Sequence, residues 1–157
     1  MIVLDASAAV QALLNDGQAR LLLAAESLHA PHLVDAEVLS ALRRLVGAGT
    51  LTADGGARCV NTWSRIGLIR YAAGPLLERI GELRQTISAY DAMYVALAEQ
   101  LDCALVTADA RSAERPRSRG PRGAGWKFHR CVQTQPGDPL ADVVSGALPE
   151  GITVSGT

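Results

Sequence analysis

The sequence predicts a single α/β domain in which a parallel sheet is flanked by helices. Short apolar runs rich in branched residues alternate with segments of helical periodicity, the pattern of parallel strands joined by helical crossovers. The chain has 157 residues, 48% of them hydrophobic, so it can bury one core but not two ordinary ones. Aromatic residues make up only 4% of the chain, and we therefore expect a core of aliphatic side chains.

The first half of the chain predicts one strand followed by helices. MIVLD is an apolar run of branched residues that stops at an acid, as a buried strand does. Apolar residues then recur at helical spacing, interrupted by Asp16-Gly17 and by a predicted loop around Pro31, and the third helical segment ends at Gly47 and Gly49. We expect a strand at residues 1–5 and helices at residues 7–15, 18–27, 33–49 and 52–65.

The second half alternates between strands and helices. IGLIRYA favours a strand, and Pro75 can start the helix that follows. Ser88 can begin the helical segment SAYDAMYVALAEQL, and ALVTAD has the composition of a buried strand. We expect strands at residues 66–72 and 104–109, and helices at residues 75–85 and from residue 88 onward.

The character of the chain changes near residue 115. Five of its seven prolines lie beyond this point, in a stretch without convincing helical periodicity. Residues 111–130 hold seven cations and one acid, which indicates either a basic arm that meets polyanions or a solvated charge run. We expect a domain at residues 1–115 and a mobile or loosely packed tail at residues 116–157.

Composition also bounds the cellular setting. The apolar N-terminal run has no basic region before it and contains Asp5, which argues against a signal peptide. No stretch approaches the roughly 20 apolar residues of a membrane helix. The three cysteines are odd in number and lack the paired spacing of zinc sites or disulfide frameworks. We expect a cytoplasmic protein without a membrane segment.

Four acids stand out by position. Asp5 and Asp109 each end a predicted strand, and the ends of adjacent parallel strands meet at the edge of the sheet where ligands bind. Glu37 lies near the apolar side of its helix, where an unpaired acid is uncommon. Asp91 follows Ser88 at the start of a helix. Taken alone, helix capping explains Asp5 and Asp91 as well as any ligand role does.

Taken together, the four acids predict a metal site. Carboxylates that meet at one edge repel each other and take up protons unless a cation neutralises them. Oxygen ligands without histidine or cysteine suit Mg²⁺ or Mn²⁺. Such a site supports hydrolysis of a phosphodiester by an activated water. The three histidines have no metal-like spacing, and we expect Asp35 to be an ordinary surface acid.

Four motifs, in this order and at these separations, resemble those of PIN-domain ribonucleases, in particular the toxins of VapBC toxin–antitoxin pairs. They are MIVLDASAAV, APHLVDAEVLSALRR, SAYDAMYVALAEQL and ALVTADAR, and they cover about residues 1–115. The resemblance implies a PIN-like parallel sheet and an endoribonuclease that depends on Mg²⁺ or Mn²⁺. The acidic quartet that it implies consists of Asp5, Glu37, Asp91 and Asp109.

The resemblance implies further residues and partners. Hydroxyls at Ser7 and Thr107 match positions that support the acids in the family. A homodimer and a cognate VapB-like antitoxin are also implied. From their position just beyond Glu37, Arg43 and Arg44 could hold RNA phosphates, although solvent exposure explains them about as well.

The ending of the chain departs from the family. Members usually finish with one more apolar strand, for which this tail has no clear equivalent, KFHRCVQ being the nearest candidate. This favours one alternative, a catalytically impaired PIN fold that binds an antitoxin or RNA without cutting. A second alternative is a small phosphatase with the same layout. A phosphatase of this kind would have an acid two residues after the first aspartate, and this chain has Ser7 at that position.

Overall fold

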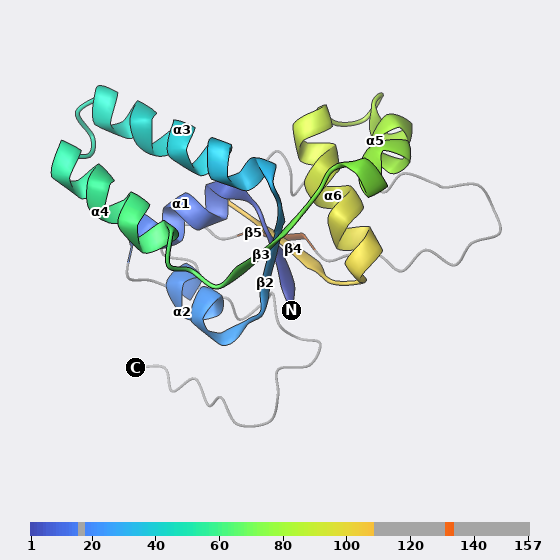
Figure 1. Cartoon of the computed structure of the whole chain (residues 1–157), viewed down its shortest axis with the longest axis horizontal. Helices are drawn as coiled ribbons and strands as arrows, with labels where there is room; N and C mark the ends of the chain where they lie inside the picture. The colour runs from blue at the N-terminus through green and yellow to red at the C-terminus, as the bar shows by residue number, and fades with distance from the viewer. Residues whose placement is uncertain (16–17, 109–130, 134–157) are drawn as a thin grey trace.

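The computed structural model describes residues 1–15, 18–108 and 131–133, and it has a parallel sheet with helices on both sides (Figure 1). The strands are β1 (Ile2–Leu4), β2 (Leu28–Pro31), β3 (Leu68–Tyr71), β4 (Ala104–Thr107) and β5 (Cys131–Gln133). The helices are α1 (Ala6–Leu14), α2 (Gln18–Ala25), α3 (Leu33–Gly47), α4 (Ala53–Trp63), the 3-10 helix η1 (Gly74–Leu76), α5 (Leu77–Leu83) and α6 (Ala89–Leu101).

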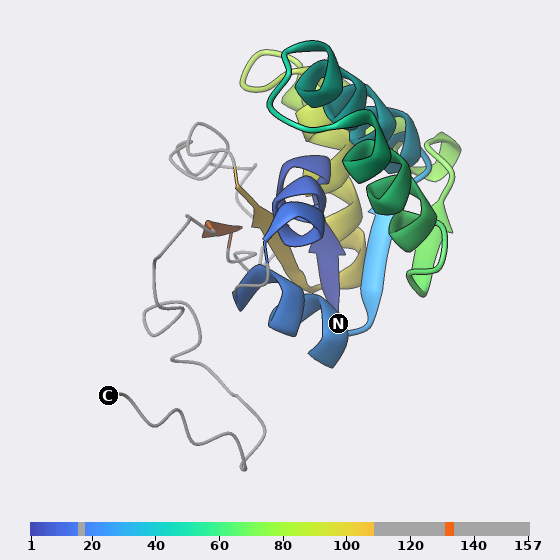
Figure 2. The same cartoon turned by 90° about the vertical axis from the view of Figure 1, so that its left-hand side faces the viewer.

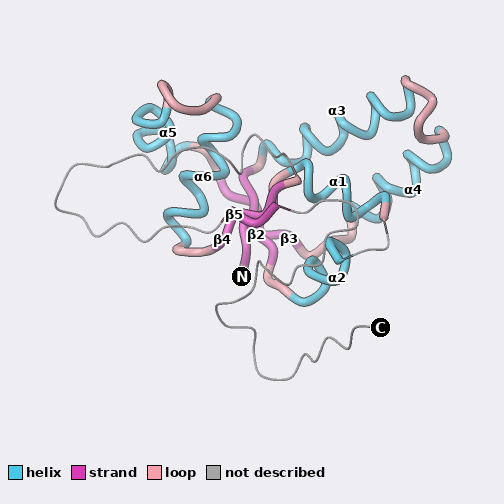
Figure 3. The backbone as a smooth tube through the Cα atoms, turned by 180° about the vertical axis from the view of Figure 1, so that it is seen from behind, coloured by secondary structure: helices cyan, strands magenta, loops and turns pink. Residues whose placement is uncertain are grey.

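The sheet has the order β3-β2-β1-β4-β5, and every strand pair is parallel. Helices α1 to α4 lie on one side of it and α5 and α6 on the other, as Figure 3 shows from behind. In Figure 2 the arrowhead of β1 points toward the end of the sheet where α3 and α6 begin. The predicted α/β fold is confirmed, and the carboxyl edge of the sheet faces the starts of two helices.

The core is aliphatic, as its composition predicts. Val3 and Leu4 of β1 are fully buried, and Leu97 of α6 packs in the same cluster. Because helices cover both faces of the central strands, these strands are apolar at successive positions rather than at alternate ones. Within the described residues, no helix has both the length and the apolar composition needed to cross a bilayer.

One expectation about the first half is wrong, because the predicted loop around Pro31 is strand β2. Its four residues are all buried between β1 and β3. Proline is tolerated because the ladder with β1 ends at His29, whereas the ladder with β3 continues through a hydrogen bond from the His32 amide to the Tyr71 carbonyl, 2.9 Å. The His29 ring and the Tyr71 hydroxyl lie 2.8 Å apart, which satisfies the buried histidine.

The last edge strand, for which the sequence offered only a weak candidate, is present. Residues of the weak candidate KFHRCVQ form β5, which pairs with β4 in the register Leu105 to Cys131 and Thr107 to Gln133. Three residues are too few to show a periodicity, so the strand is recognised only by its pairing. Residues 109–130 and 134–157 lie outside the described part of the chain, and the boundary between residues 115 and 116 stays a prediction.

Candidate functional site

Asp5 is held at the carboxyl edge of the sheet by two hydroxyls. Its amide donates to the Val106 carbonyl, 2.9 Å, so the residue continues the pairing of β1 with β4. Its Oδ2 accepts hydrogen bonds from Ser7 Oγ, 2.7 Å, and from Thr107 Oγ1, 2.6 Å. Ser7 Oγ in turn accepts from the Ala108 amide, 3.0 Å. The two hydroxyls that the sequence singled out therefore both contact the first-strand aspartate.

Helix capping does not account for the Asp5 side chain. The residue occupies the N-cap position of α1, but its carboxylate accepts no capping hydrogen bond. At the N-cap position, an aspartate side chain normally accepts a hydrogen bond from a backbone amide of the first helical turn. Since Asp5 is turned toward Ser7 and Thr107 instead, the capping alternative is not supported for this residue.

Asp91 makes a helix-capping contact and also lines the site. The Ser88 hydroxyl accepts from the Asp91 amide, 3.1 Å, and donates to Asp91 Oδ2, 2.9 Å. This exchange fixes the start of α6, as the pattern of Ser88 and an acid three residues later predicts. Asp91 also lines a small hollow together with Asp5 and Thr107, which places it beside the strand ends.

Glu37 is half-buried and reaches the same region from α3. Its Oε2 accepts a hydrogen bond from the hydroxyl of Tyr94, a residue of α6 that is only 3% exposed. Burial raises the pKa of Glu37 above its usual value, and the negative charges of Asp5 and Asp91 raise it further, while the Tyr94 hydrogen bond opposes the shift. Glu37 is therefore close enough to Asp5 and to Asp91 to be repelled by both.

A cleft of about 710 Å³ joins these acids on one side of the molecule. It is lined by Asp5, Glu37 and Asp91, and by Ser7, Ser40, Arg44 and Tyr90 among others. Three of the four predicted acids thus share one concave surface. Asp109 and its role lie outside the described residues.

The donor set suits a hard divalent cation, although it does not form a closed cage. Among the described residues, no three acidic, histidine or cysteine side chains are grouped tightly enough to enclose a metal ion. One oxygen each of Asp5, Glu37 and Asp91 accepts a hydrogen bond from a protein hydroxyl. Mg²⁺ is typically bound through one or two carboxylates and keeps several waters, so oxygen ligands in an open cleft fit it better than a cage would.

The two predicted arginines lie in different places. Arg44 lines the acidic cleft, whereas Arg43 lines a shallow hollow between α3 and α4. Sequence reasoning missed both tyrosines of the site. Tyr94 lies three residues after Asp91 on the same helix, a spacing that brings side chains to one face, so the helical period was the available signal.

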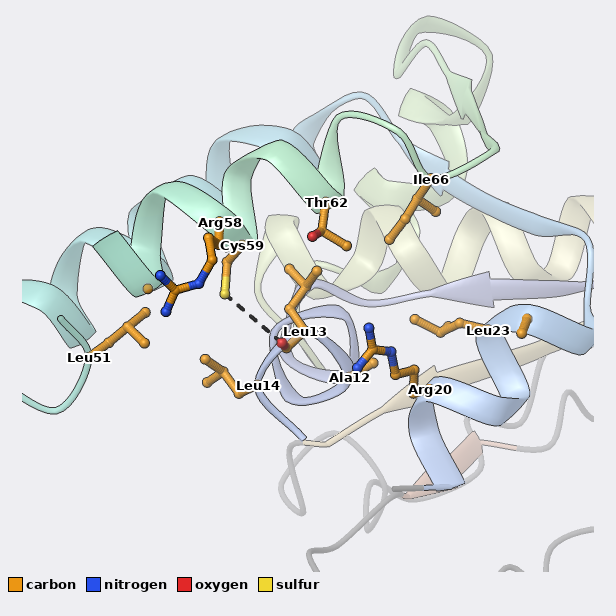
Figure 4. A pocket seen from close by; sticks show the side chains of 12 residues that line it. Ala12, Leu13, Leu14, Arg20, Leu23, Leu51, Arg58, Cys59, Thr62 and Ile66 are labelled. Carbon is orange, nitrogen blue, oxygen red and sulfur yellow. Dashed lines mark hydrogen bonds between the residues drawn. The ribbon is translucent and has the colours of Figure 1, made fainter. Parts of the chain in front are cut away.

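A second hollow, of about 400 Å³, lies between α1, α2 and α4 and shares no lining residue with the acidic cleft (Figure 4). Leu13, Leu23 and Leu51 give it an apolar lining, and Arg20 and Arg58 also line it. It contains no acid, so it has no part in the acidic site.

Comparison with known proteins identifies the family. Residues 2–117 match the PIN domain model. The VapC ribonuclease Mb0985 of Mycobacterium bovis and ribonuclease VapC9 of Mycobacterium tuberculosis are each 58% identical to this chain over 121 residues, which is 77% of this chain and 95% of each relative. Ribonuclease VapC1 of M. tuberculosis is 40% identical over 119 residues, 73% of this chain and 90% of that relative.

A solved structure shares the fold. The crystal structure of M. tuberculosis VapC20, described as a sarcin-ricin loop cleaving toxin, matches with a TM-score of 0.54 and 17% identity, over 74% of this chain and 100% of that one. The chain belongs to the PIN-domain family and, within it, to the ribonuclease toxins of the VapC type.

Proposed function

We propose that this protein is an endoribonuclease toxin of a VapBC-like pair that hydrolyses RNA phosphodiester bonds with Mg²⁺ or Mn²⁺. The observation that carries the proposal is the cleft in which Asp5, Glu37 and Asp91 meet beside the ends of β1 and β4. Mutual repulsion among these acids, which contributes to the raised pKa of Glu37, is the physical reason for a cation there.

Each residue has a distinct part in this mechanism. Asp5, Glu37, Asp91 and Asp109 would hold the ion, which supplies an activated water and neutralises charge on the scissile phosphate. Ser7 and Thr107 fix the Asp5 carboxylate through the hydrogen bonds described above. Tyr94 fixes Glu37 from the opposite helix in the same way. Of the two arginines singled out from the sequence, Arg44 lines the cleft and is the candidate contact to RNA phosphates, whereas Arg43 lies outside the cleft.

The family further supports a set of partners. A cognate VapB-like antitoxin would bind the toxin and block the acidic cleft, and the toxin itself would be a homodimer. RNA is a cytoplasmic substrate, so the toxin would act in the cytoplasm.

A binding module without catalysis is the second candidate. Its support is the ending of the chain, whose sequence from residue 116 onward departs from the family pattern. Such a module would bind an antitoxin or RNA in the same cleft without cleaving RNA. Calorimetric titration with Mn²⁺ separates the two functions, because an inactive cleft gives no binding heat that depends on the carboxylates.

Substitution of the acids tests the proposed activity. We expect Asp5→Asn and Asp91→Asn each to abolish RNA cleavage and to weaken Mn²⁺ binding, while circular dichroism spectra stay unchanged. Asp54→Asn, at an exposed acid in the first turn of α4, is the matched control and should cleave normally. Undiminished cleavage by the Asp5 or Asp91 variant would refute the assignment.

A further inference from the structure

The acidic cleft contains two side chains that metal-assisted hydrolysis does not require. Arg44 on α3 and Tyr90 on α6 line it together with Asp5, Glu37 and Asp91. One is a cation and the other a flat aromatic ring. A ligand that uses both must present an anion and a flat ring close to each other, as a nucleotide does.

Tyr90 is exposed beside a candidate ligand of the metal. Its side chain is 61% exposed, whereas Tyr94, one turn later on the same helix, is 3% exposed. Tyr90 directly precedes Asp91, and the hydrogen bonds between Ser88 and Asp91 fix the backbone of this turn. The Tyr90 ring is therefore held at an ordered start of α6 and faces solvent, so it does not serve as a core residue. An exposed aromatic face of this kind stacks on nucleic-acid bases.

Arg44 lies on the same face of α3 as Glu37. Glu37, Ser40, Ala41 and Arg44 follow the helical spacing of three, four and seven residues, and all of them line the cleft. Seven residues correspond to about 10 Å along a helix axis, so Arg44 lies further along the cleft than Glu37. In the described part of the chain, no carboxylate lies within ion-pair distance of Arg44. Its guanidinium can therefore bind a phosphate.

We propose that Tyr90 stacks on one base of the RNA bound in the cleft and that Arg44 holds a neighbouring phosphate. This inference rests on the proposed function and names two residues that contact its substrate. In a duplex both faces of each base are covered by neighbouring bases, whereas an unpaired base in a loop or at an end has a face available to an aromatic side chain. Arg44 also offsets the repulsion between the acids and the RNA backbone.

Binding measurements on full-length protein test the proposal. Fluorescence anisotropy with Ca²⁺ in place of Mg²⁺, so that the cleft is occupied by a hard cation while the RNA stays uncut, compares a short labelled single-stranded RNA with the same RNA annealed to its complement, and a gel checks that the RNA is intact. We expect the wild type to prefer the single strand. Tyr90→Ala should weaken single-strand binding roughly 5- to 150-fold, the effect of losing one stacked base, and Tyr90→Trp should retain it. Neither variant should change the affinity for Mn²⁺, which reports an intact cleft.

The two arginines provide a matched pair. Arg44→Ala should weaken single-strand binding and lower the slope of log affinity against log salt by about 0.7, the value for one phosphate contact on a single strand. Arg43→Ala, on the face toward α4, should leave this slope close to that of the wild type.

Two outcomes would overturn the inference, and they have different meanings. If the wild type binds and cleaves RNA and Tyr90→Ala binds the single strand equally well, the stacking site is wrong and the proposed nuclease stands. If the wild type neither binds nor cleaves RNA, both proposals fail.

Discussion

At the scale of single residues, hydroxyl groups rather than cations hold the acids of the cleft. Ser7 and Thr107 both donate to Asp5, and Tyr94 donates to Glu37. Hydroxyl donors fix the carboxylates without neutralising them, so the negative charge of the cleft is retained for a cation. Repulsion between the carboxylates of the metal-free cleft should therefore lower the measured stability of the protein.

Glu37→Gln should stabilise the metal-free protein near neutral pH. The folded pKa of Glu37 is raised above 4.5, so folding favours its protonated form. Below about pH 4.5 Glu37 is protonated in both states and does not destabilise the fold. As the pH rises above 4.5 and through the higher folded pKa, the charged carboxylate lowers the free energy of unfolding. Glutamine can still accept the Tyr94 hydrogen bond but carries no charge. Thermal unfolding in EDTA should show a higher Tm for the variant near pH 7 and a smaller difference near pH 4.

The sign of this effect should reverse with metal present. Mn²⁺ binds only the folded protein and stabilises the wild type by linkage, and the variant lacks one ligand. A Tm difference that is the same at both pH values in EDTA would contradict the electrostatic explanation. Glu78→Gln, at an exposed acid of α5, is the control and should show no increase in Tm.

The structure brings together those predicted residues whose signal was local or carried by a motif, and their catalytic role stays a prediction. Asp5 and Asp91 stand at element ends, and Ser7 and Thr107 belong to family motifs. The hydrogen bond from Tyr94 to Glu37 joins residues 57 positions apart on two helices. No local pattern reports a contact over that separation, and only the packing of α3 near α6 reveals it.

At the scale of elements, a cluster of side chains ties the start of α3 to β3 and α4. Asp35 accepts hydrogen bonds from Arg70 of β3, 2.6 and 2.9 Å, and from the indole of Trp63 in α4, 2.8 Å. The expectation that Asp35 is an ordinary surface acid is therefore wrong, because its partners come from elements that follow it by roughly thirty residues. These contacts fix the orientation of the helix that carries Glu37.

Asp35→Asn should lower the free energy of unfolding by about 1 kcal/mol near neutral pH, since the ion pair is partly exposed and solvent screens it. Hydrogen bonds from Arg70 lower the pKa of Asp35 below 3.8. The stabilisation is therefore present above pH 3.8 and is lost as the pH falls through the lower folded pKa. Urea unfolding monitored by tryptophan fluorescence measures the difference in free energy of unfolding between variant and wild type, once near neutral pH and once below pH 3.8.

Asp54→Asn is the matched control for Asp35→Asn, because Asp54 also lies in the first turn of a helix. It should reproduce any contribution of the helix dipole without the ion pair. Equal destabilisation by both variants would show that the pair with Arg70 contributes nothing.

At the scale of the whole molecule, the sheet order explains why four distant motifs meet. β1 lies between β2 and β4, so Asp5 at the end of β1 is adjacent to Thr107 at the end of β4, although about one hundred residues separate them. Alternating strands and helices predicted this arrangement, because right-handed crossovers leave few topologies open. β2 was missed, and β5 was only a weak candidate, for a different reason. His29 and Pro31 interrupt the apolar character of β2, and polar residues flank Cys131 and Val132 of β5, so neither segment has the apolar run of a buried strand.

The last prediction concerns the contribution of β5 to this sheet. A chain that ends at residue 115 lacks β5 and exposes the backbone of β4 as a sheet edge. We expect its free energy of unfolding to fall by about 1–4 kcal/mol, the effect of losing a few hydrogen bonds, and its Mn²⁺ affinity to fall because β4 carries Thr107. A chain that ends at residue 133 retains β5 and should keep most of the stability. Urea unfolding of the three proteins distinguishes these outcomes, and equal midpoints for the shortest chain and the full one would instead make residues 1–115 a self-sufficient domain.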